Sequence, residues 1–172
     1  QHGENNFLVW AGGGGRRTED YDTPEGTIEN SATRLSNARA GIGYFSDRFF
    51  ASGGFTMEDS RFGIPFAAVL HHEEHPEETA LGTRNVEEKM SVAIDSLRRV
   101  GRFDVGMRDL NNDVVDAFRI VINAVDFVQD EIESGNRTET IGTTFNNQTY
   151  IVRAEIDQRQ TARIAGKFGV WT

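Results

Sequence analysis

Three histidines and two glutamates stand together in this sequence, at His71, His72, Glu73, Glu74 and His75. Imidazole nitrogens and carboxylate oxygens bind zinc and similar divalent ions, so this segment is the candidate metal site of the chain. The HExxH motif of zinc proteases is absent, and a flexible segment of this kind binds weakly because ordering it costs entropy. A solvated acidic loop explains the same residues without any metal.

The other groups that could do chemistry are explained more simply as structure. The glycines at 12–15 precede two arginines, but the Lys-Ser/Thr pair of a phosphate-binding loop is missing and no helical pattern follows. A strand packed closely against a neighbour fits them better. No Ser/His/Asp group is convincing, and the paired carboxylates lie in polar segments without an apolar pocket to tune them. We therefore expect no catalytic residue, no resident cofactor and no enzyme activity.

The net charge and the cysteine content exclude some classes of partner and site. The net charge is −9 and no basic patch is present, so nucleic acid is not an expected partner. The chain has no cysteine, which excludes disulfides and thiolate metal sites. It also has 18 glycines and 12 phenylalanines among many charged residues, which suits a sheet with one apolar face and one wet face.

Apolar and polar residues alternate with a period of two in several segments. Phe103, Val105 and Met107 alternate with Arg102, Asp104 and Arg108, and similar patterns occupy residues 38–44, 49–58, 150–157 and 164–170. Strands place successive side chains on opposite faces, so each segment presents an apolar stripe and a polar stripe. No run of about 18 apolar residues could form a membrane-spanning helix, but a barrel strand crosses with only ~9–11 residues.

The segments between the predicted strands differ in length. Short turn signals lie at 46–48, at 111–113 and near 158–160, whereas long polar segments lie at about 20–32, 59–89 and 129–148. Bacterial outer-membrane barrels have this asymmetry, with tight periplasmic turns and long outer loops. Charged residues of the polar stripes would face the lumen, and aromatic residues such as Trp10, Tyr44 and Tyr150 fit either interfacial girdles or strand packing.

Two segments also fit a helical pattern. Apolar residues three or four positions apart occur within 86–100 and 114–130, so two amphipathic helices are an alternative there. The β-branched run at 120–122 favours a strand in the second segment.

Several short motifs resemble one family in order and spacing. Residues 17–24 (RTEDYDTP) are similar to the RRTDDYxxP stretch of TonB-dependent receptor barrels, and residues 60–65 (SRFGIP) to their SxYGIP strand end. Asn30 and Ser31 lead into a glycine-rich strand that precedes residues 47–50 (DRFF). Residues 130–133 (DEIE) and 141–147 (IGTTFNN) resemble an outer loop of the family, and the His/Glu segment matches a subgroup associated with metal uptake.

The resemblance implies an all-β fold: an antiparallel meander of about seven strands, forming part of a 22-stranded barrel with a plugged lumen. Residues 1–172 would then be a partial barrel domain, cut at both ends, without the plug and the C-terminal strands. The implied function is import of a scarce ligand, such as a metal or siderophore, across the bacterial outer membrane. The implied partners are that ligand, with zinc one candidate, outer-membrane lipid, and the energy-transducing TonB protein acting on the plug. The alternative is a soluble periplasmic α+β or all-β binding module with a His/Glu metal-binding loop.

Overall fold

Every regular element of the computed structural model is a β-strand. The structure describes residues 2–4, 6–65, 91–135, 138–161 and 163–172, and these contain no helix, hence none that could cross a membrane. The ten strands are β1 (His2–Glu4), β2 (Phe7–Thr18), β3 (Tyr21–Thr23), β4 (Gly26–Ile28), β5 (Thr33–Phe45), β6 (Phe49–Ile64), β7 (Ser91–Met107), β8 (Val115–Gly135), β9 (Thr138–Gln158) and β10 (Lys167–Trp171).

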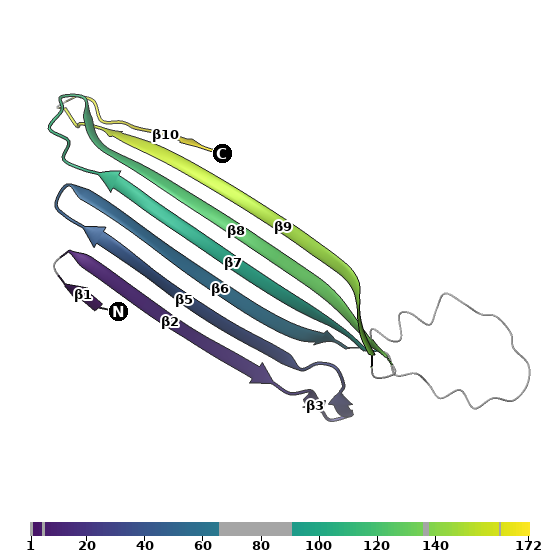
Figure 1. The fold of residues 1–172 in the computed structure, drawn as a ribbon. Coiled ribbons are helices and arrows are strands. Elements are labelled where there is room, and N and C mark those ends of the chain that lie inside the picture. Colours follow the sequence, from purple (N-terminus) through teal and green to yellow (C-terminus); the bar gives the residue numbers. More distant parts are fainter. Residues whose placement is uncertain (1, 5, 66–90, 136–137, 162) are drawn as a thin grey trace, which may run out of the picture.

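Eight of these strands form one antiparallel sheet in the order β1-β2-β5-β6-β7-β8-β9-β10 (Figure 1). Each strand pairs with the next one along the chain, except that the small β3–β4 hairpin interrupts the path from β2 to β5. The predicted all-β antiparallel meander is therefore confirmed, with eight strands where about seven were expected. The sheet order begins at β1 and ends at β10, so the sheet is open in this structure.

The helical alternative is wrong for the described residues of both segments, since β7 and β8 are strands throughout. Their pairing gives the reason. Phe118 and Val128 face one side of the sheet, whereas Val121 and Val125 face the other, because both faces of β8 carry apolar residues here. A strand with apolar residues on both faces mimics a helical stripe when only the spacing is considered.

The two ends of the sheet differ in their connections. Residues 46–48, 108–114 and 159–166 join strands at one end, called here the turn end. Residues 19–32, 65–90 and 136–137 join strands at the opposite end, called the far end. The prediction of long connections at this end is right for residues 19–32 and 65–90, but it is wrong for the third, because only residues 136–137 join β8 to β9. Residues 59–64 and most of 129–148 are strand rather than loop. Their polar residues remain in strands because the backbone of β6, β8 and β9 continues its ladder of hydrogen bonds there.

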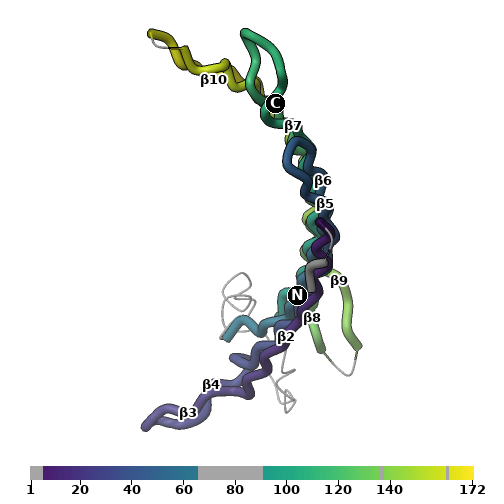
Figure 2. Tube along the Cα trace, turned by 90° about the vertical axis from the view of Figure 1, so that its left-hand side faces the viewer, coloured from purple at the N-terminus to yellow at the C-terminus, as the bar shows by residue number. Residues whose placement is uncertain are grey.

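The sheet is a single bowed layer. Figure 2 shows it nearly edge-on, with β10 at one end of the bow and β3 and β4 at the other. Among the described residues no second layer covers either face, and the few buried apolar side chains are Val92, Ala93, Ile94, Val121 and Ile132. A soluble domain buries the apolar face of its sheet against another layer. This sheet leaves both faces uncovered, and their chemistry therefore decides what can lie against each.

Candidate functional site

One face of the sheet, called the band face, carries a continuous apolar band in the half near the turn end. The row of directly paired residues through its middle crosses six strands and consists of Val9, Ile42, Gly53, Phe103, Ile122 and Val152. The next row towards the far end is also apolar: Ala11, Ala40, Phe55, Gly101, Ala124 and Tyr150. Phe55 is 48% exposed and Phe103 is 45% exposed. Exposed apolar surface of this extent marks a contact with another protein or a membrane.

Aromatic rings border the band at the turn end. The ring centroids of Phe7 and Tyr44 are 4.9 Å apart, and those of Tyr44 and Phe49 are 6.3 Å apart. Further along the same border, Ile156 of β9 is paired with Phe118 of β8 on one side and with Phe168 of β10 on the other. The predicted aromatic border is found here for Tyr44. Trp10, another candidate, lies on the opposite face, because it pairs with Gly41 there. Trp171 also lies on that face, where it pairs with Arg153.

The band face changes to polar residues towards the far end. Arg99 binds Asp126 at 3.0 Å, and the amide of Gln148 donates to the same carboxylate at 3.3 Å. One step further, the hydroxyl of Thr144 donates to Asp130 at 2.7 Å. The band on β6 runs from Phe49 to Met57, about 26 Å along the strand at ~3.3 Å per residue. On β7 and β8 it ends one row earlier, because Met57 pairs with Arg99 and Arg99 pairs with Asp126.

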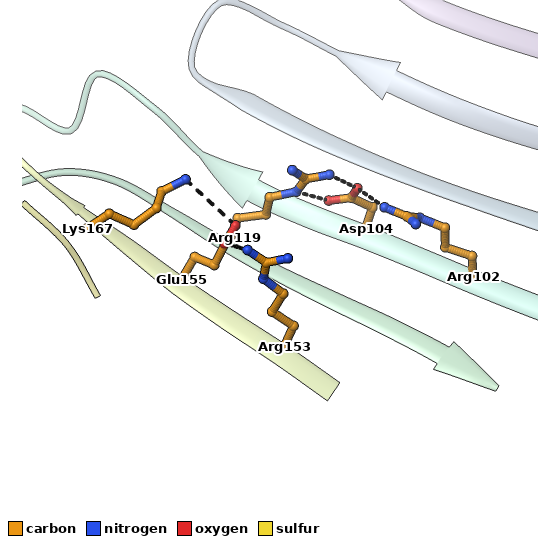
Figure 3. Close-up of polar contacts among 6 residues, drawn as sticks. All are labelled: Arg102, Asp104, Arg119, Arg153, Glu155 and Lys167. Carbon is orange, nitrogen blue, oxygen red and sulfur yellow. Dashed lines mark hydrogen bonds and ion pairs between the residues drawn. The ribbon is translucent and has the colours of Figure 1, made fainter. Parts of the chain in front are cut away.

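The opposite face, called the charged face, carries an ion-pair cluster behind the same band. Arg119 of β8 holds Asp104 of β7 with both arms of its fork: Nε donates to Oδ1 at 2.8 Å and Nη2 donates to Oδ2 (Figure 3). Arg102 lies 3.4 Å from the same carboxylate. Asp104 is only 8% exposed. A carboxylate this buried stays ionised because two guanidinium groups compensate its charge.

The cluster continues across β9 to β10. Glu155, also 8% exposed, accepts a hydrogen bond from Arg153 and lies 3.9 Å from the ammonium of Lys167, which is 3.4 Å from Asp157. Arg119 stands directly opposite Glu155 in the strand pairing, so the two carboxylate centres belong to one network. Figure 3 shows the six side chains gathered over four neighbouring strands. These ion pairs link neighbouring strands through their side chains. They also make this face polar, so that it can contact water or a polar partner.

A hollow of about 370 Å³ lies beside this cluster, lined in part by Phe50, Asp104 and Arg119. Aromatic rings lie across glycines nearby. A Cβ built on Gly41 would be 2.4 Å from the indole of Trp10, and one on Gly106 would be 2.5 Å from the ring of Phe50. These glycines are required because the rings occupy the space that any side chain would need.

A clasp of hydrogen bonds anchors the connection between β2 and β5 at the far end. The carboxylate of Asp20 accepts hydrogen bonds from the backbone N–H groups of Ser31 (2.7 Å), Ala32 (2.8 Å) and Asn30 (3.2 Å). The pKa of Asp20 lies below the ordinary value of 3.8, first because of the bond from the Ser31 N–H group. Desolvation is the second-largest effect and opposes this shift, and the bonds from Ala32 and Asn30 lower the pKa further.

Asn30 ties the clasp to the sheet. Its backbone is left-handed, with φ at 60°, a conformation that asparagine tolerates better than most residues. In this conformation its side-chain amide donates to the carbonyls of Ile64 at 2.9 Å and Val92 at 2.7 Å. The clasp thus joins the ends of β6 and β7, which 26 residues of sequence separate, from 65 to 90. Asp20 lies in the segment 17–24, which resembles a motif of the receptor family, and Asn30 and Ser31 are the pair that resembles another. Their role here is structural.

The predicted metal ligands His71, His72, Glu73, Glu74 and His75 lie outside the described residues. Within the described ranges, no group of three or more His, Asp and Glu side chains could hold a metal ion. The predicted polar stripe is brought together as expected for Arg102, Asp104, Arg153, Glu155 and Asp157. Arg39 is on the same face but outside the cluster, and Arg108 lies over the ring of Phe50 at 5.4 Å.

Sequence reasoning missed the centre of the cluster, Arg119. Residues 120–122 next to it are all β-branched, so no alternation of apolar and polar residues predicts which face of the sheet carries Arg119. Only the register of β8 against β7 and β9 shows that Arg119 lies on the charged face. Sequence reasoning also missed the clasp, because no sequence pattern predicts a contact between Asn30 and Val92. No protein-family model and no curated protein matches this sequence.

Proposed function

We propose that this chain is part of the wall of an outer-membrane β-barrel of the TonB-dependent receptor type, which binds a scarce ligand and imports it. The band face would lie against lipid and the charged face would line the lumen. The turn end would then be periplasmic, and the far end, with the two longest connections (19–32 and 65–90), would be on the outer side. Catalysis is no part of this proposal.

The observation that carries the proposal is the continuous apolar band on the band face, whereas charged residues such as Arg102 and Asp104 interrupt the apolar residues of the opposite face. The length of the band on β6 corresponds to a height of about 20 Å at the usual strand tilt of ~40°, close to the ~25 Å apolar band of outer-membrane barrels. Three rows of the band, those through Ala51, Gly53 and Phe55, are continuous over six neighbouring strands, and the residues within each are paired directly. Buried ion pairs on the opposite face are consistent with a wet lumen, because charged residues in a membrane face the protein interior or water.

The order of motifs from residue 17 to residue 147 supports the family assignment within this class. In that family, a plug inside the barrel is displaced by the TonB protein, and outer loops capture the ligand. The charged face then has a second role as the surface against which the plug rests. The hollow beside Asp104 and Arg119 offers polar groups of both signs for such a contact.

The rival function is a soluble binding module. Its α+β form is excluded for residues 91–107 and 115–135, which are strands in this structure. Its all-β form requires a second layer over the band, since about 25 cal/mol is lost for each Å² of apolar surface left in water. An unidentified partner that covers the band would supply that layer.

Membrane fractionation of the full-length gene product separates the two functions. Expressed in a Gram-negative host with its native leader, the protein is expected in the outer-membrane fraction and is expected to resist extraction with alkaline carbonate. Recovery from the soluble periplasmic fraction without detergent would contradict the proposal and favour the binding module.

The ligand remains a separate question, to which residues 71–75 suggest an answer. If these residues capture a metal, replacing His71, His72 and His75 together with alanine weakens zinc binding at least tenfold by calorimetry. His2→Ala is the matched control, because His2 is the only other histidine of the chain. Unchanged zinc binding in the triple variant would remove metal capture by this segment and leave the barrel proposal intact.

A further inference from the structure

Three arginines stand side by side on the band face, beyond the far edge of the band. Arg17 of β2 pairs directly with Arg34 of β5, and Arg34 pairs directly with Arg61 of β6. We call these three residues the arginine row. Neighbouring strands lie about 4.8 Å apart, so the row brings three guanidinium groups onto a surface only ~10 Å wide.

Like charges placed directly opposite each other destabilise a sheet unless something of the opposite sign offsets them. Arg61 is offset in part, by Glu139 at 2.8 Å and Asp95 at 3.5 Å. In the described part of the chain, Arg17 and Arg34 have no ion-pair partner and both are exposed. The row therefore has two unused cationic groups that point to the same side.

The position of the row relative to the band indicates what it meets. Met57 ends the band on β6 and Arg61 follows on the same face, about 13 Å further along the strand at ~3.3 Å per residue. At a tilt of ~40° that distance is about 10 Å along the membrane normal. The headgroup layer extends ~5–8 Å beyond the hydrocarbon, and an arginine side chain reaches back across the remainder.

A hollow of about 350 Å³ opens on the same face beside the row, lined in part by Arg34, Arg61 and Arg99. Its other lining includes acidic residues, of which Asp59 lies one row nearer the band and Asp95 is occupied by Arg61. Asp130, the third acidic residue of the lining, accepts a hydrogen bond from Thr144, whereas Arg34 has no ion-pair partner in the described part of the chain and so is available to an anion.

We propose that the arginine row binds the phosphate of a membrane lipid headgroup, with Arg17 and Arg34 as the principal donors and Arg61 as the third. A guanidinium presents a fork of N–H donors that matches phosphate oxygens, and such charge-assisted hydrogen bonds are stronger than neutral ones. The inference rests on the proposed function, because only a band face in contact with lipid brings headgroups to this depth.

The test compares two lipids that differ only in the phosphate. Native mass spectrometry of the detergent-solubilised full-length protein is used to titrate dioleoylphosphatidic acid, dioleoylglycerol and inorganic phosphate. The wild-type protein is expected to retain phosphatidic acid at least tenfold better than dioleoylglycerol. Arg17→Gln with Arg34→Gln is expected to abolish that difference.

The matched control is Arg16→Gln with Arg39→Gln, which removes two arginines of the same two strands from the opposite face. It is expected to bind phosphatidic acid as the wild type does. Undiminished binding by the Arg17/Arg34 variant would overturn the proposal, as would equal loss in the control. Inorganic phosphate that competes at equal concentration would overturn the lipid assignment and indicate a site for the free anion.

A second measurement guards against a variant that fails to fold. Arg34→Gln removes both like-charge pairs, so without lipid its urea midpoint is expected at or above that of the wild type. With phosphatidic acid present the order is expected to reverse, and no reversal would contradict the proposal. If only the lipid-binding prediction for the arginine row fails, the proposed function still stands on the membrane fractionation. If the protein is recovered as a soluble periplasmic protein, the proposed function is wrong whatever the row binds.

Discussion

The two halves of each long strand differ in how they divide their faces. In the half near the turn end, the band face is apolar and the charged face carries buried carboxylates such as Asp104. In the far half, the band face is polar and carries Arg99 and Asp126. The opposite face carries apolar residues there, such as Ile94, Phe127 and Phe145. A soluble sheet that packs on one side keeps its apolar face along the whole strand. The comparison shows that the band face is apolar only in a slab across the strands.

The largest effect is expected from a charge placed inside that slab. Phe103→Arg puts a guanidinium in the middle row of the band, and should cost about 2–4 kcal/mol of unfolding free energy in a bilayer. Leu97→Arg, on the same strand and face but in the far half, should cost about 0–1 kcal/mol. Urea titration of the protein folded in phospholipid vesicles measures both. Equal losses of unfolding free energy in the two variants would contradict the difference between the halves.

The turn-end half of the charged face is tested at its glycines. Gly41→Ala adds a methyl group 2.4 Å from the indole of Trp10 and should cost about 1–3 kcal/mol. Gly101→Ala is the matched change in the band, since nothing lies within 4 Å of its Cβ. Trp emission in a Trp171→Phe background should shift for the first variant alone. An unchanged spectrum in Gly41→Ala would mean that the indole lies elsewhere.

The ion-pair cluster should contribute less. Asp104→Asn keeps the shape but leaves Arg119 and Arg102 without their carboxylate, at a cost of about 1–2 kcal/mol. This figure is discounted because the side chains of Arg119 and Arg102 are 44% and 55% exposed. Asp59→Asn, at an aspartate without an ion pair in the described far half, should change stability by about 0–0.5 kcal/mol. A larger loss of unfolding free energy in Asp59→Asn than in Asp104→Asn would contradict the difference between the two halves.

The clasp at the far end should depend on pH. The pKa of Asp20 is lowered in the folded protein, so its contribution is fully present above the ordinary value of 3.8 and is lost as pH falls through the lower folded pKa. Protection of the Ser31 and Ala32 amides against hydrogen exchange, relative to intrinsic rates at each pH, should therefore hold at pH 5 and above and fall below about pH 4. Asp20→Asn should reduce that protection at every pH. Protection that persists at low pH would exclude the clasp as its cause.

The sequence predicted the fold well where alternation is strict. Phe103, Val105 and Met107 were placed on one face from spacing alone, and the structure confirms them. Strand ends were predicted less well, because polar residues at 59–64 and 138–148 resemble loops when their hydrogen-bonded neighbours are unknown.

The site was predictable only in part. The faces of Asp104 and Glu155 follow from alternation, but their shared partner Arg119 depends on register across three strands. The arginine row depends on register as well, since Arg17, Arg34 and Arg61 are far apart in the chain and form one surface only when β2, β5 and β6 are aligned. Spacing within a segment carries no information about such alignment.

The central claim, that the band face lies in lipid, can be measured directly because the chain has no cysteine. Single cysteines at Ile122→Cys and Asn123→Cys carry a bimane label on adjacent residues of β8, one on each face. In vesicles that contain lipid brominated along the acyl chains, strong quenching is expected for the label at 122 and little for the label at 123. Equal quenching at both positions, or none at 122, would contradict the account.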